Sequence, residues 1–429
     1  MNQQALLNQL NAPKPDDRLD ALRQLKQLRD AGHLAVPVRG RDVNNHIHTI
    51  YSFSPYSPAK AVWMADQAGL STAGIMDHDS ISGAREFISA GEIIGLPTTI
   101  GAECRASFAG TRLEGRRINN PDQSTVAYVA LHGVPHSRID ALTAFFEPIR
   151  QARSRRNQAM ISRLNELLVP AEIILDYDRD IVSLSAWADG GEVTERHLLY
   201  ALALKLLDRF GAGADLVSFL RETLGIQVNA KAGQQLTEAG NPHLAYDLLG
   251  VLKSDLVEKF YVDAADECPP IAEVAAFARE NGIILAYAYL GDVISSVTGD
   301  KKAQTFEDSY LDELFAVLKE IGFAAVTYMP SRNTREQLMR LRSLCDQHGF
   351  FQISGEDINQ PRQAFICESM RDPYFANLYD AAWALIGHER LATANLAHGM
   401  FSRETLVKLP DLTDRICHFR DAAIYVKRE

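Results

Sequence analysis

The chain is poor in cysteine, lacks a long apolar run and carries no excess of positive charge. Its 429 residues include only five cysteines, which are widely scattered and form no CxxC pair. This usage predicts a reduced, cytoplasmic protein with neither a disulfide framework nor a cysteine zinc site. The most apolar helical stretch, 198–207, is interrupted by Lys205, so we expect no membrane span. The first ten residues, MNQQALLNQL, lack the basic and apolar regions of a secretory signal.

The composition is that of an acidic globular protein. Lys and Arg number 44 against 55 Asp and Glu, which gives a net charge of −11, and 46% of the residues are hydrophobic. Such a balance argues against a disordered or fibrous chain, and against a nucleic-acid polymer or an anionic membrane as partner. The length allows two or three domains, or one large α/β barrel that carries an insertion.

Short strands and helices alternate from about residue 41. Apolar runs predict strands over 43–49, 72–76 and 98–102, with helices over 58–68 and 82–94 between them. This order predicts parallel strands joined by right-handed crossovers. A fourth strand is expected over 125–134, and an amphipathic helix over 16–31 precedes the first strand.

Residues 139–280 have mostly helical periodicity and are interpreted as a helical insertion. The alternation resumes beyond it, and the tail is expected to be helix plus loop. The expected strands and helices of this second part are 282–289, 311–321, 324–329, 334–348 and 351–355. The predicted division is therefore an extension (1–40), a first barrel part (41–138), the insertion (139–280), a second barrel part (281–375) and a tail (376–429).

Potential metal ligands stand at the ends of the first three strands. His46 and His48 are two residues apart and so share one face of the first strand, while His78 ends the second strand and Glu103 the third. Parallel strands present such ends at one mouth of a barrel, and imidazole with carboxylate suits zinc, manganese or iron. Each motif alone has an ordinary structural explanation as a pocket residue, a helix cap or an ion-pair partner. Three such strand ends, with their spacing matched, favour a metal site.

The same segments carry a family resemblance. HIHTIYSFSPYSP, GIMDHDSISG and TIGAE resemble the HxHTxxSDG…P, TDHDTxxG and GxE motifs of the polymerase-and-histidinol-phosphatase (PHP) family of metal-dependent phosphoesterases. Later segments follow in the family's order: VTERH (193–197), 282–293, VTYMPSRNTRE (326–336) and SGEDIN (354–359). The resemblance covers 41–138, 153–205 and 280–362.

This resemblance implies an α/β fold, a distorted seven-stranded (β/α) barrel with up to three metals at its mouth. His46, His48, Glu103 and Asp357 would hold the first metal. Glu103 would also bridge to a second metal, which His197 would bind as well. His78 belongs to the third-metal group.

Several positions depart from the family pattern. Phe53 stands where the family has an acidic or imidazole ligand, Asn359 where it has its last histidine, and Tyr289-Leu290 where it has a His-Pro pair. The family's fourth-strand histidine falls at Ala127 or Tyr128 here. His132 could replace that histidine only after a register shift. We therefore expect one or two divalent metals, manganese, zinc or iron, and His78 then acts as a hydrogen-bond donor or general acid.

Arginines supply the candidate phosphate contacts. Arg153 and Arg156 lie in a basic cluster on the helix after the fourth strand, and guanidinium groups bind phosphate oxygens in pairs. The alternative is a solvated helix face. Arg332, in a loop at the barrel mouth, is a further candidate.

Together these features predict a cytoplasmic metal-dependent phosphoesterase that hydrolyses a small phosphorylated metabolite or nucleotide through a metal-bound hydroxide. The helical insertion would overhang the mouth and select the substrate. Two alternatives stay open: a metal-dependent hydrolase of a C–N or ester bond, and a degenerate PHP barrel with a binding or regulatory role. The sequence makes no prediction of the oligomeric state.

Overall fold

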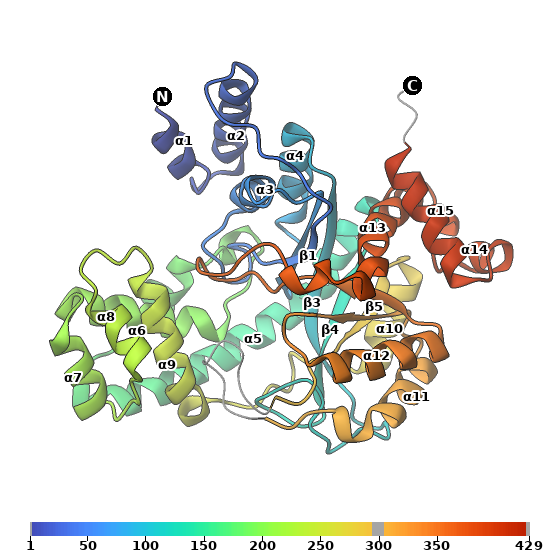
Figure 1. Ribbon diagram of the computed structural model, residues 1–429. Coiled ribbons are helices and arrows are strands. Elements are labelled where there is room, and N and C mark those ends of the chain that lie inside the picture. Colours follow the sequence, from blue (N-terminus) through green and yellow to red (C-terminus); the bar gives the residue numbers. More distant parts are fainter. Residues whose placement is uncertain (1, 294–303, 426–429) are drawn as a thin grey trace.

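The computed structural model describes residues 2–293 and 304–425 and is an α/β fold built on a seven-stranded, barrel-like sheet (Figure 1). The strands lie side by side in chain order, and a bridge between Ile47 and Ile358 brings the segment after the last strand back to the first. The predicted fold class is therefore confirmed. The strands are β1 (Val43–Ile47), β2 (Thr72–His78), β3 (Thr98–Ser107), β4 (Val126–His132), β5 (Ile284–Ala288), β6 (Ala325–Tyr328) and β7 (Phe351–Ser354).

One strand runs against the others. The strands β1, β2 and β3 pair in parallel, as do β5, β6 and β7, whereas β4 is antiparallel to both β3 and β5. The carboxyl ends of all strands except β4 consequently lie at the same end of the sheet. This end is the mouth, where active sites of such folds are built.

The helices follow local sequence signals. Ser57 accepts a hydrogen bond from the Lys60 backbone N–H and Pro58 follows it, so that α3 begins there as predicted. A capping box of Thr334 and Gln337 begins α12. The helices around the barrel are α1 (Gln3–Gln9), α2 (Pro15–Asp30), α3 (Pro58–Gln67), α4 (Ala84–Ile94), α10 (Ile271–Glu280), α11 (Leu311–Ile321) and α12 (Arg335–His348). Those between β4 and α10 are α5 (Ile139–Leu168), α6 (Glu195–Phe210), α7 (Ala214–Glu222), α8 (Ala230–Thr237) and α9 (Leu244–Phe260).

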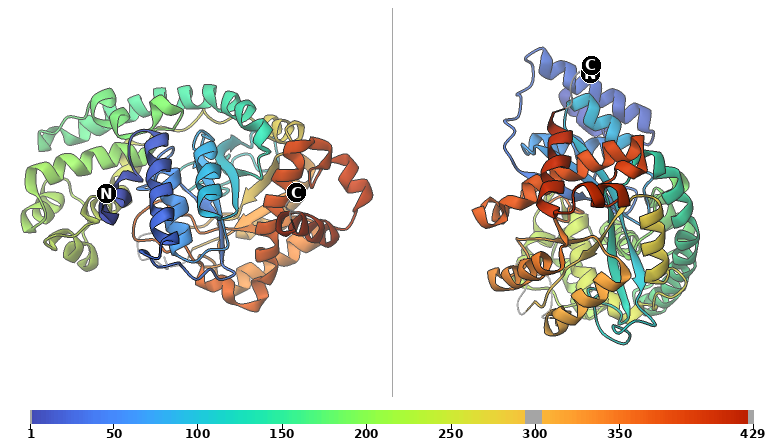
Figure 2. Two further views of the ribbon diagram at one scale, coloured as in Figure 1. Left: turned by 90° about the horizontal axis from the view of Figure 1, so that it is seen from above. Right: turned by 90° about the vertical axis from the view of Figure 1, so that its right-hand side faces the viewer.

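The helices α6–α9 gather on one side of the sheet, and the long helix α5 reaches toward them (Figures 1 and 2). They have a hydrophobic core of their own, which runs in sequence from Met160 to Phe260 and also takes in Phe53 from the β1–α3 loop. The first half of α5, which includes Phe146, packs in the core of the barrel, and so does α10. At the two ends of the predicted insertion, the first half of α5 and the whole of α10 therefore pack with the barrel.

The opposite end of the barrel is covered by α13 (Ala376–Ala394). Inward-facing strand residues such as Ala130 and Ala286 pack against Ala384 and Leu385 of this helix. Glu389 accepts hydrogen bonds from the Thr99 hydroxyl and the Ile100 backbone N–H at the start of β3. The tail continues through α14 (Arg403–Lys408) and α15 (Leu412–Ile424). None of the helices in the described part of the chain has both the length and the apolar character of a membrane span.

A candidate metal site at the mouth of the barrel

The strand ends bring the predicted ligands together. His46 lies in β1 and His48 directly follows it, while His78 and Glu103 are opposite one another in the β2–β3 pair. The backbone of the segment after β7 pairs with that of β1 through hydrogen bonds between Ile358 and both His46 and His48. This pairing places Asp357 beside the histidines.

Three donor atoms converge at the bottom of the mouth. The Nε2 atoms of His46 and His48 are 3.2 Å apart, and Oε1 of Glu103 lies 3.5 Å from the first and 3.4 Å from the second. Ligand atoms about 2.0–2.2 Å from a tetrahedral ion lie about 3.3–3.6 Å from each other. Oδ1 of Asp357, 3.1 Å from Nε2 of His48, offers a further donor. The donor set and its spacing therefore fit a divalent metal.

His78 borders this group. Its Nδ1 lies 3.1 Å from Oε1 of Glu103, yet the atom is buried and has no aligned hydrogen-bond partner. Its ring centroid is 4.8 Å from that of His48. A buried nitrogen that faces a carboxylate without bonding to it is suited to a ligand that would lie between them.

A chain of hydrogen bonds behind His48 fixes its orientation. The Ser52 hydroxyl donates to Oδ1 of Asp77 at 2.6 Å, and its oxygen lies 3.1 Å from Nδ1 of His48. Asp77 also accepts from the backbone N–H and hydroxyl of Thr49. Because the Ser52 hydroxyl uses its hydrogen in the bond to Asp77, the Ser52 oxygen accepts a hydrogen bond from Nδ1–H of His48. The lone pair of His48 is thereby left on Nε2, which faces the other donors.

Replacing Ser52 by alanine is expected to weaken metal binding about 10–100-fold, the usual effect of losing such an outer partner. Titration with a competing metal-chelating dye measures the affinity. Ser54→Ala is the matched control, because Ser54 lies in the same loop and its hydroxyl accepts a hydrogen bond from the backbone N–H of Tyr56. An unchanged affinity in Ser52→Ala, or an equal loss in both variants, contradicts this assignment.

The electrostatics favour charged carboxylates at this site. Burial raises the pKa of Glu103, but the nearby imidazoles of His78 and His46 outweigh burial and lower the pKa to about 2. Burial likewise raises the pKa of Asp357, but the adjacent imidazole of His48 reverses the effect and holds the pKa well below its usual range. Burial lowers the pKa of His78 to about 3 and keeps its ring neutral. Metal ligands require deprotonated carboxylates and neutral imidazoles, so a metal here would have to displace the proton that Glu103 favours on His46, whose pKa is raised despite burial.

The candidate metal ligands line a cavity of about 440 Å³ at the mouth of the barrel. The floor of this cavity consists of His46, His48, His78, Glu103 and Asp357. One wall is apolar and comes from the β1–α3 loop, α6 and α9, and the rim is charged. The wall includes Phe53, Leu199, Tyr246, Leu249, Gly250 and Val257, and the rim includes Arg196, Lys253, Glu258 and Arg332. The helices between β4 and α10 thus contribute directly to the mouth.

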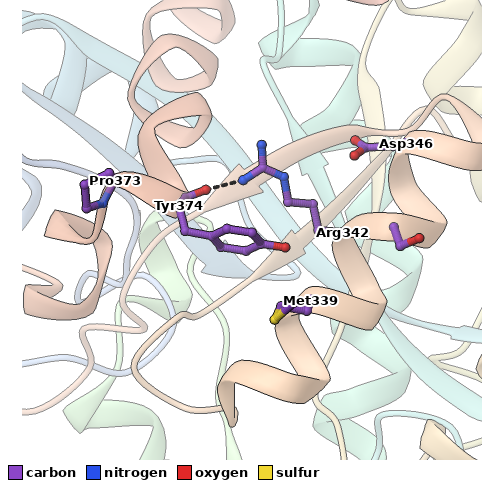
Figure 3. A pocket seen from close by; sticks show the side chains of 6 residues that line it. Met339, Arg342, Asp346, Pro373 and Tyr374 are labelled. Carbon is purple, nitrogen blue, oxygen red and sulfur yellow. Dashed lines mark hydrogen bonds between the residues drawn. The ribbon is translucent and has the colours of Figure 1, made fainter.

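A second hollow of about 460 Å³ lies between α12 and the segment before α13 (Figure 3). There Arg342 donates a hydrogen bond to the backbone carbonyl of Tyr374 and lies 4.6 Å from the centre of its ring. The lining includes one carboxylate, Asp346, and no histidine. The convergent donors at the barrel mouth make that cavity the stronger candidate.

The arginines expected to contact phosphate are engaged with carboxylates. Arg153 is 2% exposed and pairs with Asp79 at 2.5 Å and with Glu195 at 2.9 Å. Arg156 pairs with Glu195 at 2.6 Å and with Glu267 at 2.7 Å. Of the two, Arg153 lines the cavity and Arg156 lies behind it. Arg332 also lines the cavity and donates to the carbonyl of Leu290.

His197 is engaged with the backbone at the start of α6, and the ligand role that the resemblance implied for it stays a prediction. Its Nδ1 accepts the backbone N–H of Thr194 at 3.0 Å in a capping box at the start of α6. Burial, with a contribution from Arg153, lowers its pKa to about 3, so the ring is neutral. A neutral ring that accepts at Nδ1 carries its proton on Nε2, so metal binding at Nε2 would require this hydrogen bond to break. The edge of the ring packs against Phe53 at 4.9 Å between centroids.

Two contributions to the site were not predicted from the sequence, the contacts of Asn359 and the α9 wall. Asn359, which stands in place of the expected histidine, donates to Oδ1 of Asp357 at 2.6 Å and accepts from Arg196. It therefore orients the carboxylate rather than binding a metal. The α9 wall also went unnoticed, although the helical spacing of Tyr246, Gly250 and Val257 places them on one face.

Comparison with known proteins supports the fold. Neither a family model nor a curated protein sequence matches the chain. A solved structure described as a candidate metal-dependent phosphoesterase from Bifidobacterium adolescentis is similar over 79% of this chain and 96% of its own, at 19% identity and a TM-score of 0.50. An amidohydrolase from Chromobacterium violaceum, with bound sulfate and no metal, is similar over 76% and 90%, at 17% identity and a TM-score of 0.49. The first similarity shows a shared fold.

Proposed function

We propose that the chain is a metal-dependent phosphoesterase of the PHP type that acts on a small phosphorylated metabolite or nucleotide. The observation that carries the proposal is the triangle of His46 Nε2, His48 Nε2 and Glu103 Oε1 on the floor of a cavity large enough for such a molecule. In this proposal one or two ions of manganese, zinc or iron are held there, with Asp357 as a further ligand.

A bound divalent ion supplies a Lewis acid that neutralises phosphate charge and lowers the pKa of a coordinated water. The protein's own groups bind and orient. Ser52 and Asp77 hold His48 in the tautomer that presents Nε2, and Asn359 fixes the Asp357 carboxylate. His78, neutral at physiological pH, donates an N–H to an oxygen of the phosphate or of the leaving group.

The phosphate contacts of the proposal come from the cavity wall. Arg153 and Arg332 line the cavity, and guanidinium N–H groups match phosphate oxygens. Arg156 pairs with Glu195 and Glu267 behind the wall, and we assign it to the support of Glu195.

A second candidate is a metal-dependent hydrolase of a C–N or carboxylic ester bond. Arg105, Arg153 and Arg156 are balanced by Asp79, Glu195 and Glu267, which reduces the positive charge available to a phosphate. A less charged substrate fits that balance, and a metal polarises a carbonyl as well as a phosphoryl oxygen.

Reconstitution with metal separates the candidates. Protein stripped by a chelator and reloaded with manganese, zinc or iron is expected to release phosphate from a panel of phosphomonoesters, and to lose that activity when the chelator returns. Amide or ester hydrolysis without phosphate release favours the second candidate. Stoichiometric metal without turnover of any panel member contradicts both, and leaves a binding role for the barrel.

A further inference from the structure

Neither the backbone conformation nor the packing of α9 explains why a glycine lies in the middle of this helix. Gly250 lies within Leu244–Phe260, where a glycine lowers helix stability relative to alanine. Its φ is not positive, and a Cβ added there would meet no atom within 4 Å. An alanine at this position would therefore fit without strain and would stabilise the helix.

Two other helical glycines are explained by close contacts, whereas Gly233 of α8, like Gly250, has none. A Cβ on Gly91 of α4 would lie 2.8 Å from the carbonyl oxygen of Leu96, and one on Gly387 of α13 would collide with the backbone of Phe419. Gly250 has no such neighbour. It is exposed and lines the cavity at the barrel mouth, which Gly233 does not.

The surroundings of Gly250 combine an apolar, aromatic group of side chains with two polar neighbours, Lys253 and Ser254, which also line the cavity. Tyr246, one turn earlier, and Val257, two turns later, lie on the same face of α9 and line the cavity with Leu249. The ring of Tyr246 is 5.8 Å from that of Phe53. The missing side chain thus leaves an open space beside an aromatic surface.

This surface is connected to the metal donors. The guanidinium of Arg196 lies 6.0 Å from the centre of the Phe53 ring and donates to Asn359, which in turn donates to Asp357. Phe53 and Asp357, the two ends of this chain of contacts, line the same cavity of about 440 Å³. A single ligand can therefore contact the donors with one end and the α9 wall with the other.

We propose that Gly250 determines substrate specificity by leaving room for a flat apolar ring on the non-phosphate part of the substrate. The ring packs against Tyr246 and Leu249 of the α9 wall while the phosphate lies at the metal donors. This inference rests on the proposed phosphoesterase function and adds the class of ester, an aryl or similarly planar one.

The first test adds bulk at this position. Gly250→Phe, with Gly250→Leu as a milder second variant, is expected to lower kcat/KM for 1-naphthyl phosphate at least tenfold more than kcat/KM for methyl phosphate. Gly233→Phe is the matched control. Gly233 also lies within a helix, α8, and its Cβ would meet only a Val228 methyl at 3.9 Å, but it does not line the cavity. Equal effects on the two esters, in folded Gly250 variants, overturn the inference.

The second test does not depend on catalysis. Fluorescence titration with 1-naphthol, which has the ring but no phosphate, is expected to show binding that Gly250→Phe weakens at least tenfold and Gly233→Phe preserves. If naphthol binds in this way but no phosphate ester is hydrolysed, the ring site stands and the proposed function fails. If wild-type protein does not bind naphthol, or all variants bind it equally, the ring site is overturned whatever the activity.

Discussion

Glu103→Gln is expected to remove most of the metal that the protein retains, and the hydrolytic activity with it. The carboxylate faces the imidazoles of His46, His48 and His78, and its pKa of about 2 keeps it charged throughout the physiological range. Glutamine keeps the shape but brings no charge. We expect the affinity for manganese or zinc to fall more than about 100-fold, beyond the usual loss for an outer-sphere partner. Metal per chain, measured after dialysis, and phosphate release report the two effects.

The control for this variant removes a carboxylate elsewhere. Glu320→Gln lies at the surface of α11, where Glu320 pairs with Arg112 with both side chains more than half exposed. It is expected to retain wild-type metal content, because the two sites share no contact. A Glu103→Gln protein that holds as much metal as Glu320→Gln would remove Glu103 from the metal site.

Arg153→Ala is expected to lower the free energy of unfolding by about 3–5 kcal/mol, the usual cost of removing one partner of a buried ion pair. The guanidinium is buried and joins Asp79, from the loop after β2, to Glu195 at the start of α6. Without the Arg153 guanidinium, buried Asp79 loses its ion-pair partner, and Glu195 keeps only its ion pairs with Arg105 and Arg156. Denaturant unfolding measures the change.

Arg155→Ala is the matched control, two positions along the same helix. Arg155 is exposed, so its removal is expected to change stability by less than about 0.5 kcal/mol. If Arg153→Ala is as stable as Arg155→Ala, the structural role assigned to the two ion pairs of Arg153 is wrong. A raised KM for a phosphate ester would then leave the guanidinium with its proposed phosphate contact alone.

Much of the architecture could be predicted from periodicity. The helix Leu311–Ile321 matches its predicted bounds, and Ala84–Ile94 and Arg335–His348 lie within two residues of theirs, because each combines helical spacing with a clear beginning or end. The reversed direction of β4 was not predicted. Periodicity shows that a segment is a strand but not which way it pairs, and the turn from β3 to β4 covers residues 108–125. The helix α1 was also missed.

The candidate site could be predicted where it depends on strand geometry. The two-residue spacing of His46 and His48, and the register of His78 with Glu103, follow from the pleat and from parallel pairing. Features that depend on distant contacts could not be predicted. Arg156 meets Glu267 across 111 residues of chain, and the tautomer of His197 is set by a cap that forms only once α6 begins at Thr194.

The most direct test of the metal site is a crystal structure of the protein grown with manganese, with diffraction data collected for its anomalous signal. The account predicts one or two anomalous peaks at the barrel mouth, the first within about 2.0–2.3 Å of Nε2 of His46, Nε2 of His48 and Oε1 of Glu103. A fully loaded crystal with no peak within reach of these three atoms would contradict it.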